Sequence, residues 1–148
     1  MVIRIYAITK NKNDDIKYIK LIEKFGVFIK VSNIFNKKIN ASQKISPKAA
    51  KSAYGIEFLK YLDSNARNIA LHPSGKELDT YEFSKLIQDS NTNFFIGGAF
   101  GFNEDFLNKV ESISLSKLTL NHDIAKIVLC EQIYRALCII YNLSLIHI

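Results

Sequence analysis

The order in which apolar segments follow one another constrains the fold of this chain more than any other sequence feature. Short apolar runs at residues 2–8, 67–71 and 93–98, and an alternating segment at 27–35, have the length and composition of strands. They alternate with segments whose apolar residues recur at helical spacing. This alternation is typical of an α/β domain. The sequence therefore predicts a mostly parallel sheet flanked by helices, built by all 148 residues as one domain.

The connecting segments carry recognisable helix starts and ends. Gly26 can end the first helix, Ser46 followed by proline can begin the next, and Asn121 can cap the last. The helices are expected at about residues 16–25, 47–62, 80–90, 104–110 and 122–141. Three segments are expected to be non-helical, namely a polar and basic loop at 36–46, a turn at 72–75 and an irregular stretch at 113–120.

A glycine-rich stretch, "NFFIGGAFGFNEDF" (93–106), follows one predicted strand directly. Ligands of α/β proteins bind beyond the carboxyl ends of the strands. Gly97, Gly98 and Gly101 would let the backbone approach such a ligand closely. The pattern matches neither the dinucleotide fingerprint nor the P-loop, because no Gly-Lys-Ser/Thr follows. A tight turn from strand to helix would explain the same glycines, so both interpretations stay open.

The predicted last helix is apolar around most of its circumference. Such a helix must be covered on all sides, which in a chain of this size is easiest when a second subunit covers one face. The sequence therefore predicts a homodimer. Glu131 and Arg135, four residues apart, can form an ion pair on this helix. Cys130 and Cys138 lie about 12 Å apart along its axis, too far for a disulfide, and are expected to be core thiols in a reducing cytoplasm.

The charge of the chain is unevenly distributed. Residues 1–64 hold 13 Lys and Arg against 5 Asp and Glu, whereas residues 65–148 hold 7 against 9. A basic half suggests an anionic partner such as nucleic acid, although lysine-rich solvated helices would look the same. No segment is long and apolar enough to predict a membrane span, and no signal peptide is expected. The three histidines have no metal-ligand spacing with the cysteines, so no metal site is expected.

Three stretches in order carry a resemblance to a known family. They are "IALHPSGKELDTYEFSKLI" (69–87), "FFIGGAFGFNEDF" (94–106) and "SLSKLTLNHDIAKIVLCEQIYRA" (114–136). Together they resemble the ribosomal RNA large subunit methyltransferase H family, the minimal form of the SPOUT class of knotted methyltransferases. The resemblance implies a deep trefoil knot near the C-terminus, a homodimer and a cytoplasmic enzyme. Periodicity alone could not have predicted the knot, because knots are rare in proteins.

The resemblance also implies a cofactor, a substrate and the residues that hold them. In this family S-adenosylmethionine is cradled by the glycine loop and two neighbouring loops, and the N3 atom of a pseudouridine in helix 69 of 23S rRNA is methylated on the assembled 70S ribosome. The matching cofactor positions here are Leu71, Gly97, Gly98, Leu115, Ser116, Lys117, Leu118, Thr119 and Leu120. The matching catalytic positions imply that His122 lies near the target base, with Glu131 and Arg135 orienting the site.

Other functions stay open on the sequence alone. The N3 proton must leave during methylation, but the sequence does not identify the group that accepts it. A catalytically silent ribosome-binding or assembly factor on the same scaffold would share these motifs. A generic α/β enzyme for a small ligand, with an incidental basic half, is a further alternative. Cofactor binding and ribosome binding distinguish the three.

The chain departs from the family pattern at three places. The family usually has an acidic residue where this chain has His72, and an arginine where it has Lys126. The family tail of His-Pro-Tyr-His followed by a basic residue is replaced by "YNLSLIHI", so His147 is not assigned the role of the family histidine. Residues 143–148, "LSLIHI", equal the translation of a sequencing adapter, CTGTCTCTTATACACATC, and are suspected to be non-native.

Overall fold

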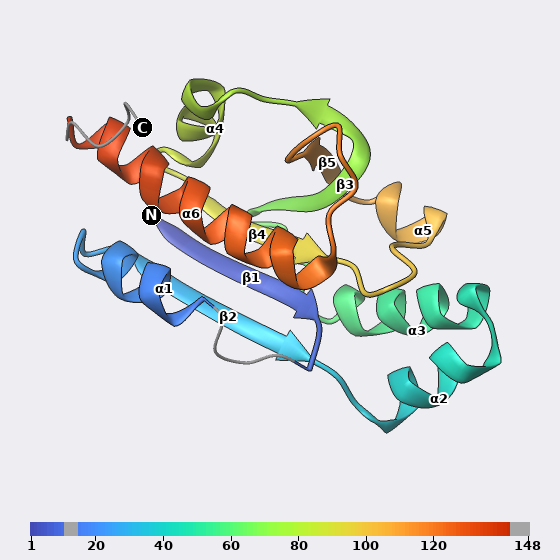
Figure 1. Ribbon diagram of the computed structural model, residues 1–148. Helices are drawn as coiled ribbons and strands as arrows, with labels where there is room; N and C mark the ends of the chain where they lie inside the picture. Colours follow the sequence, from blue (N-terminus) through green and yellow to red (C-terminus); the bar gives the residue numbers. More distant parts are fainter. Residues whose placement is uncertain (11–14, 143–148) are drawn as a thin grey trace.

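The structure is a computed structural model that describes residues 1–10 and 15–142. In this part of the chain, a five-stranded parallel sheet has the strand order β2-β1-β4-β3-β5 (Figure 1). The strands are β1 (Val2–Ile8), β2 (Phe28–Ile34), β3 (Arg67–Glu77), β4 (Asn91–Ile96) and β5 (Glu111–Ser114). The predicted α/β class with a parallel sheet is confirmed.

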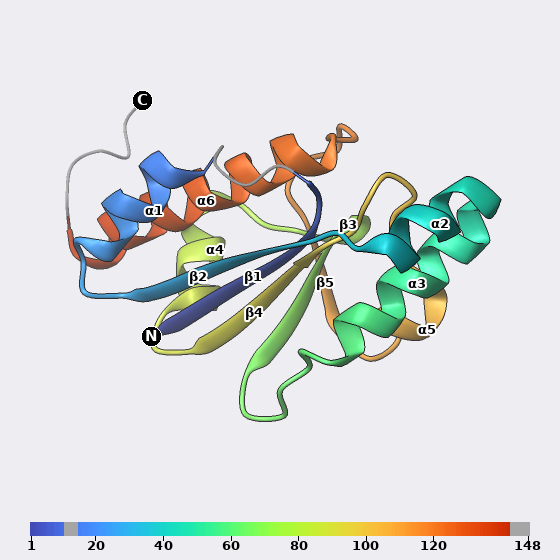
Figure 2. The same cartoon turned by 90° about the horizontal axis from the view of Figure 1, so that it is seen from below.

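Helices cover both faces of the sheet (Figures 1 and 2). One core forms between the sheet and α1 (Ile16–Glu23), α4 (Thr80–Ile87) and α6 (His122–Ile140). A second core forms between the opposite face and α2 (Lys37–Ile45), α3 (Pro47–Leu59) and α5 (Glu104–Leu107). Because both faces are buried, the central strands need apolar residues at consecutive positions rather than at alternate ones.

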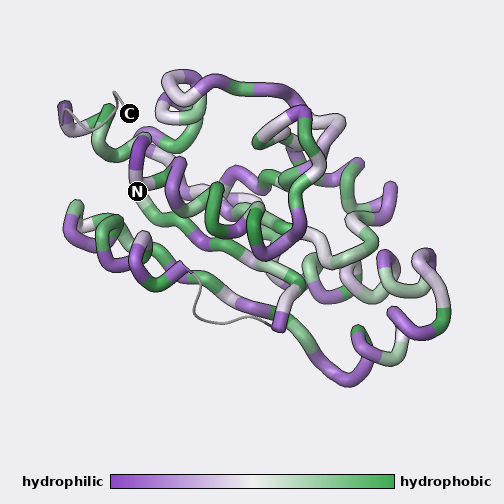
Figure 3. The backbone as a smooth tube through the Cα atoms, viewed as in Figure 1, coloured by the Kyte–Doolittle hydropathy of each residue, from purple (hydrophilic) through white to green (hydrophobic). Residues whose placement is uncertain are grey.

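The central strands divide their side chains between the two cores. Ile5 of β1 and Phe94 of β4 belong to the core under α6, whereas Tyr6 and Phe95 belong to the core under α3. Successive side chains of a strand point to opposite faces, which explains this division. Figure 3 shows the mostly hydrophobic colour of β1 in the middle of the molecule, with hydrophilic residues frequent along the outer helices. The sequence therefore locates β1, β2, β4 and the first part of β3 correctly.

The loop predicted at 36–46 is wrong, because Lys37–Ile45 forms α2. The Asn36 side chain accepts a hydrogen bond from the Ile39 backbone N–H at 2.8 Å and caps the helix. Ile39 is fully buried in the core under α3 and anchors α2. One buried residue among so many polar ones gives no clear helical period, so only the tertiary contact reveals the helix. The predicted cap at Ser46 is confirmed by its hydrogen bond from Ala49.

The segments expected to be a turn and an irregular stretch contain strand residues. β3 continues through residues 72–75 to Glu77, but its register with β5 shifts between Leu71 and Lys76. The predicted turn therefore coincides with the interruption in the pairing between β3 and β5. The sequence gives no signal that β3 pairs with β5 again at Lys76 and Glu77. Glu111–Ser114 forms the short strand β5. The trefoil knot stays a prediction, and the suspected tail at 143–148 lies outside the described residues.

Helix α6 buries more than apolar side chains. Cys130 and Cys138 are both buried free thiols, as predicted. Lys126 is also fully buried, and its ammonium donates a hydrogen bond to the Asn33 side-chain oxygen at 2.9 Å. A buried ammonium needs such partners because its desolvation is costly. Lys126, which departs from the family arginine, therefore has a structural role between α6 and β2.

Candidate active site at the carboxyl edge of the sheet

The carboxyl ends of the parallel strands meet at one edge of the sheet, and the first turn of α6 lies there too. β1 ends at Ile8, β4 at Ile96 and β5 at Ser114. Ala125 of α6 lines a cavity with residues from β3 and β5, whereas His122 lines another cavity with residues from β1 and α2. The start of α6 therefore contributes to two hollows at the edge where α/β proteins bind ligands.

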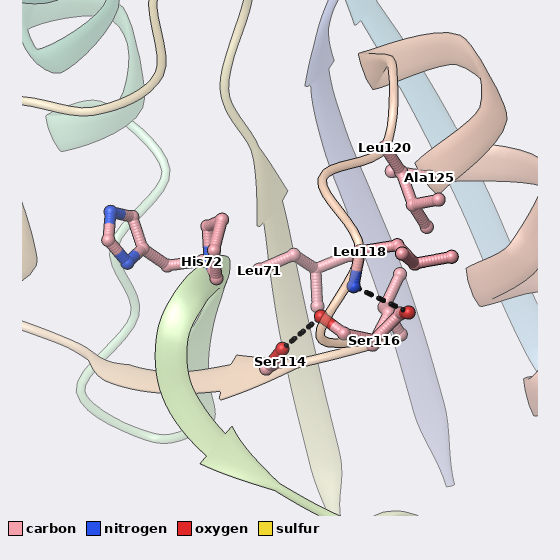
Figure 4. A pocket seen from close by; sticks show the side chains of 9 residues that line it. Leu71, His72, Ser114, Ser116, Leu118, Leu120 and Ala125 are labelled. Atoms are coloured by element: carbon pink, nitrogen blue, oxygen red, sulfur yellow. Dashed lines mark hydrogen bonds between the residues drawn. The ribbon is translucent and has the colours of Figure 1, made fainter.

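The first hollow, which we call the loop cavity, has a volume of about 60 Å³. Figure 4 shows Leu118, Leu120 and Ala125 gathered on one side of it, while the His72 ring extends the other way. The Ser114 hydroxyl donates to the Ser116 carbonyl at 2.8 Å, and the Ser116 hydroxyl accepts from the Leu118 N–H at 3.0 Å. The lining residues are Leu71, His72, Pro73, Ser114, Leu115, Ser116, Leu118, Leu120 and Ala125.

The structure brings most of the predicted cofactor residues to the loop cavity, but not all of them. Five of the nine line it, namely Leu71, Leu115, Ser116, Leu118 and Leu120. Lys117 and Thr119 belong to the same loop without being among the lining residues, and Gly97 and Gly98 follow β4. The walls are mainly aliphatic, and the Ser114 and Ser116 hydroxyls shape the loop.

The two glycines after β4 are required by the packing of their own loop. A Cβ atom on Gly97 would lie 2.9 Å from the Gly101 backbone, and one on Gly98 would lie 2.6 Å from the Tyr54 ring. Gly98 and Gly101 also form an antiparallel bridge, and Gly101 has a φ of 84°. The turn interpretation therefore accounts for these glycines without a ligand, and their contact with a cofactor stays a prediction.

The second hollow, which we call the edge cavity, has a volume of about 320 Å³ and polar walls. The Thr9 hydroxyl donates to Asp123 Oδ1 at 2.5 Å, and His122 Nε2 lies 3.6 Å from Asp123 Oδ2. The lining residues are Ile8, Thr9, Lys10, Phe35, Gln43, Ala99, His122 and Asp123. The sequence alone identifies only His122 here, because contacts between residues more than a hundred positions apart leave no local pattern.

Tyr54 connects the glycine loop to the edge cavity. Its side chain is fully buried, and its hydroxyl donates to Gln43 Oε1. Burial raises the pKa of Tyr54, while backbone hydrogen bonds from Phe100 and Ala99 act in the opposite direction. The Tyr54 hydroxyl therefore lies beside the glycine loop and donates its hydrogen bond to Gln43 of α2.

The predicted pair on α6 forms, but it lies away from His122. Arg135 Nε donates to Glu131 Oε1 at 3.0 Å, and both side chains are partly exposed. The hydrogen bond to Glu131 raises the pKa of Arg135. His122 precedes Glu131 by nine residues, or about 13 Å along a helix. A single chain therefore does not bring the three predicted catalytic residues together, and their catalytic roles stay predictions.

Neither a metal centre nor a membrane span is found within residues 1–10 and 15–142. No three His, Cys, Asp or Glu side chains there are grouped so that they could hold a metal ion. No helix in that part of the chain combines the length and apolar character needed to cross a membrane.

Comparison with known proteins gives the same family over almost the whole chain. The family model described as predicted SPOUT methyltransferase matches residues 1–144. A Helicobacter hepaticus protein named ribosomal RNA large subunit methyltransferase H is 46% identical over 151 residues, covering 96% of this chain and 97% of the relative. A Helicobacter acinonychis protein of the same name is 44% identical over 141 residues, covering 93% and 94%.

The chain belongs to the SPOUT methyltransferase family. The resemblance inferred from three motifs is thereby confirmed, and so is the predicted enzyme class. In this SPOUT methyltransferase, the motif at 114–136 forms the end of β5, the wall of the loop cavity and most of α6. The motif at 94–106 supplies the glycine loop that Tyr54 supports. The motifs that identify the family are therefore the segments that build the carboxyl edge of the sheet.

Proposed function

We propose that this SPOUT methyltransferase transfers the methyl group of S-adenosylmethionine to N3 of a pseudouridine in helix 69 of 23S rRNA, on the assembled 70S ribosome in the cytoplasm. Its relatives with 46% and 44% identity are named for methylation of large-subunit ribosomal RNA. The basic first half of the chain supports an RNA partner, because lysines neutralise phosphates.

The loop cavity suits the adenosine part of the cofactor in chemistry, although its volume is small. Aliphatic walls and backbone groups can hold an adenine ring, and the bound sulfonium supplies an activated methyl group without a metal. Ligand pockets usually measure roughly 300 Å³ or more, whereas the loop cavity measures about 60 Å³. Leu118 is 74% exposed. We therefore expect the loop at 115–120 to move outwards when the cofactor binds.

In this proposal the residues of the chain bind the cofactor, orient the target base and exclude water from the site. His122 faces the edge cavity and is the predicted residue nearest to the target base. Glu131 and Arg135 form an ion pair on the outer side of α6, where a second subunit would contact them. Together with partly exposed Ile124 and Val128, they form the face that we propose for a homodimer.

One observation carries the proposal, namely the gathering of five predicted cofactor residues around the loop cavity in a chain of this family. The test combines calorimetric titration with S-adenosylmethionine and transfer of a labelled methyl group to 70S ribosomes or to free 23S rRNA. We expect binding, and we expect label in helix 69 of intact ribosomes. Gly97→Trp should abolish both, because even a Cβ atom at Gly97 clashes with the Gly101 backbone.

A second variant separates a lost site from a lost fold. Leu118 is exposed, so Leu118→Asp should fold normally while placing a charge on the wall of the loop cavity. We expect it to weaken cofactor binding about tenfold or more. A folded wild-type chain that binds ribosomes but no S-adenosylmethionine would contradict the proposal and favour a silent assembly factor. Cofactor binding without any affinity for ribosomes would favour a small-ligand enzyme.

A further inference from the structure

The edge cavity is lined by several polar side chains, among them Lys10, Gln43 and Asp123. Its volume of about 320 Å³ is enough for a nucleobase, and Phe35 and Ala99 supply apolar wall between the polar side chains. We propose that the edge cavity binds the Watson–Crick edge of a uracil-type base and that Gln43 and Asp123 read it. This inference rests on the proposed function and adds the recognition of the target base to it.

The reading depends on the orientation of the Gln43 amide. Its Oε1 atom accepts the hydrogen bond that the Tyr54 hydroxyl donates. The Gln43 amide therefore presents its NH₂ group as the remaining donor at the wall of the edge cavity. Tyr54 is fully buried, so this orientation is fixed before any base arrives. A fixed donor selects a carbonyl oxygen of the ligand.

Asp123 supplies the acceptor that a uracil-type base also needs. Its carboxylate is held by the Thr9 hydroxyl on one oxygen and lies beside His122 with the other. A carboxylate has about four lone-pair sites, so it can accept a further N–H. Lys10 supplies a second donor, because it lines the cavity. Its ammonium lies 4.6 Å from the centre of the ring of Phe35, which lines the cavity too. The walls thus offer two donors and one acceptor.

This set complements uracil and does not complement cytosine. The uracil edge presents a carbonyl, the N3–H and a second carbonyl, which need a donor, an acceptor and a donor. Cytosine presents an amino group in place of one carbonyl and no N3–H, so its edge leaves donors facing donors. Uridine and pseudouridine share this edge. The edge cavity is therefore expected to reject cytidine and to accept uridine and pseudouridine equally.

The same contacts give the methyl transfer a proton acceptor. The N3–H bond breaks as its proton passes to the Asp123 carboxylate, and the electron pair on N3 forms the new bond to the methyl carbon. The bond between that carbon and the sulfonium sulfur breaks, and its electron pair stays on sulfur as S-adenosylhomocysteine. The Lys10 ammonium stabilises the negative charge that develops on the carbonyl oxygens. Asp123 accepts the proton within hydrogen-bond reach of the base.

The test measures the binding of three RNA hairpins that differ only at the target, which is uridine, pseudouridine or cytidine, with S-adenosylhomocysteine present. The wild-type chain should bind the first two equally and the cytidine hairpin about tenfold more weakly. Gln43→Glu keeps the acceptor for Tyr54 but replaces the NH₂ donor by an oxygen. It should therefore lose about tenfold for uridine and bind cytidine more tightly. Gln88→Glu, the same change at an exposed site at the end of α4, should leave all three affinities unchanged.

A second readout tests Asp123 itself. Asp123→Asn keeps an acceptor for Thr9 but cannot take up a proton, so methyl transfer should slow at neutral pH and recover as alkaline pH ionises N3. A merely structural role would give no such recovery. Calorimetry with S-adenosylmethionine should find unchanged affinity in Gln43→Glu, because Gln43 does not line the loop cavity.

The outcomes separate this inference from the proposed function. Wild-type methylation of ribosomes together with unchanged base preference in Gln43→Glu would overturn the inference alone. Loss of cofactor affinity in that variant would also overturn it, since Gln43 would then act through the glycine loop. A wild-type chain that neither binds the hairpins nor transfers a methyl group to ribosomes would overturn both.

Discussion

The Tyr54 ring lies so close to Gly98 that it leaves no room for a side chain at position 98. A Cβ atom on Gly98 would lie 2.6 Å from Tyr54 Cζ, and the Tyr54 side chain is fully buried. We expect Gly98→Ala to lower the free energy of unfolding by about 1–3 kcal/mol in urea denaturation, as overpacking does. It should also weaken S-adenosylmethionine binding, measured by calorimetry.

Gly26→Ala is the matched control for this change. Gly26 has a φ of 75°, and no atom lies within 4 Å of the place that its Cβ would take, so alanine there causes backbone strain without a clash. It should reduce stability by about 1 kcal/mol and leave cofactor affinity unchanged. Equal cofactor affinity in Gly98→Ala and the wild type would show that the glycine loop does not position the cofactor.

The buried thiol of Cys130 is expected to make the free energy of unfolding depend on pH in the alkaline range. Burial, and secondarily the charge of Asp15, raises the pKa of the thiol from 9.0 to about 12. The native state therefore keeps the proton that the unfolded chain loses above pH 9. The stabilisation is complete below about pH 9 and is lost as the pH rises towards 12, with a slope of up to about 1.4 kcal/mol per pH unit.

Cys130→Ala is expected to remove this contribution to the pH dependence. Its free energy of unfolding should be lower at neutral pH because of the cavity, but it should fall less steeply between about pH 9 and pH 11, as measured by urea titrations at each pH. Identical slopes in the variant and the wild type would contradict a protonated buried thiol. In the native state the thiol should also react slowly with a thiol reagent at about pH 8, because little thiolate is present.

At the scale of the element, α2 and α3 carry a cluster of lysines next to the edge cavity. Gln43 of α2 lines that cavity, and Lys44 and Lys48 on either side of the link between the helices are exposed. We expect Lys44→Gln combined with Lys48→Gln to weaken ribosome binding in pelleting assays. The slope of log affinity against log salt should become shallower by about 0.7 for each phosphate contact that is lost.

A matched pair of changes outside these helices provides the control. Lys85 and Lys109 are exposed lysines in the half of the chain that has no basic excess. Lys85→Gln combined with Lys109→Gln removes the same charge and should leave the salt slope unchanged. Equal losses in the two double variants would mean that net charge, and not the α2–α3 pair, attracts the ribosome.

At the scale of the whole molecule, the outward face of α6 decides whether two chains associate. Ile124 is 49% exposed, and Ile127, Val128, Glu131 and Arg135 follow it on the same side of the helix at intermediate exposure. We expect the wild-type chain to be a dimer in light scattering and Ile124→Lys to shift it towards a monomer by about tenfold or more in dissociation constant, because a lysine cannot be buried there without a partner.

Leu59→Lys tests whether the effect is specific to this face. Leu59 ends α3 and is 43% exposed, so the change matches Ile124→Lys in chemistry and exposure but lies on another helix. The variant should remain dimeric. A monomeric wild-type chain at the concentrations of the assay would contradict the proposed dimer. Dissociation of the Leu59→Lys variant alone would indicate that the interface lies on α3 instead.

The sequence by itself determined the features that depend on near neighbours along the chain. Apolar runs predicted β1 and β4 because buried parallel strands need apolar residues at successive positions, whereas alternating apolar and polar residues predicted β2. Caps such as Ser46 and Asn121 were predicted because a helix start is a local hydrogen bond. The family was also determined by sequence, since its motifs are contiguous stretches.

The tertiary structure decided everything that joins distant positions. The hydrogen bond from Thr9 to Asp123, the contact of Tyr54 with Gly98 and the burial of Lys126 beside Asn33 all link residues far apart in sequence. Helix α2 has no clear helical period in the sequence, because its one buried residue, Ile39, is recognisable only within the core that it shares with α3 and β1. Local periodicity records which face of an element is apolar, but not which element covers it, so the two cavities followed only from the folded chain.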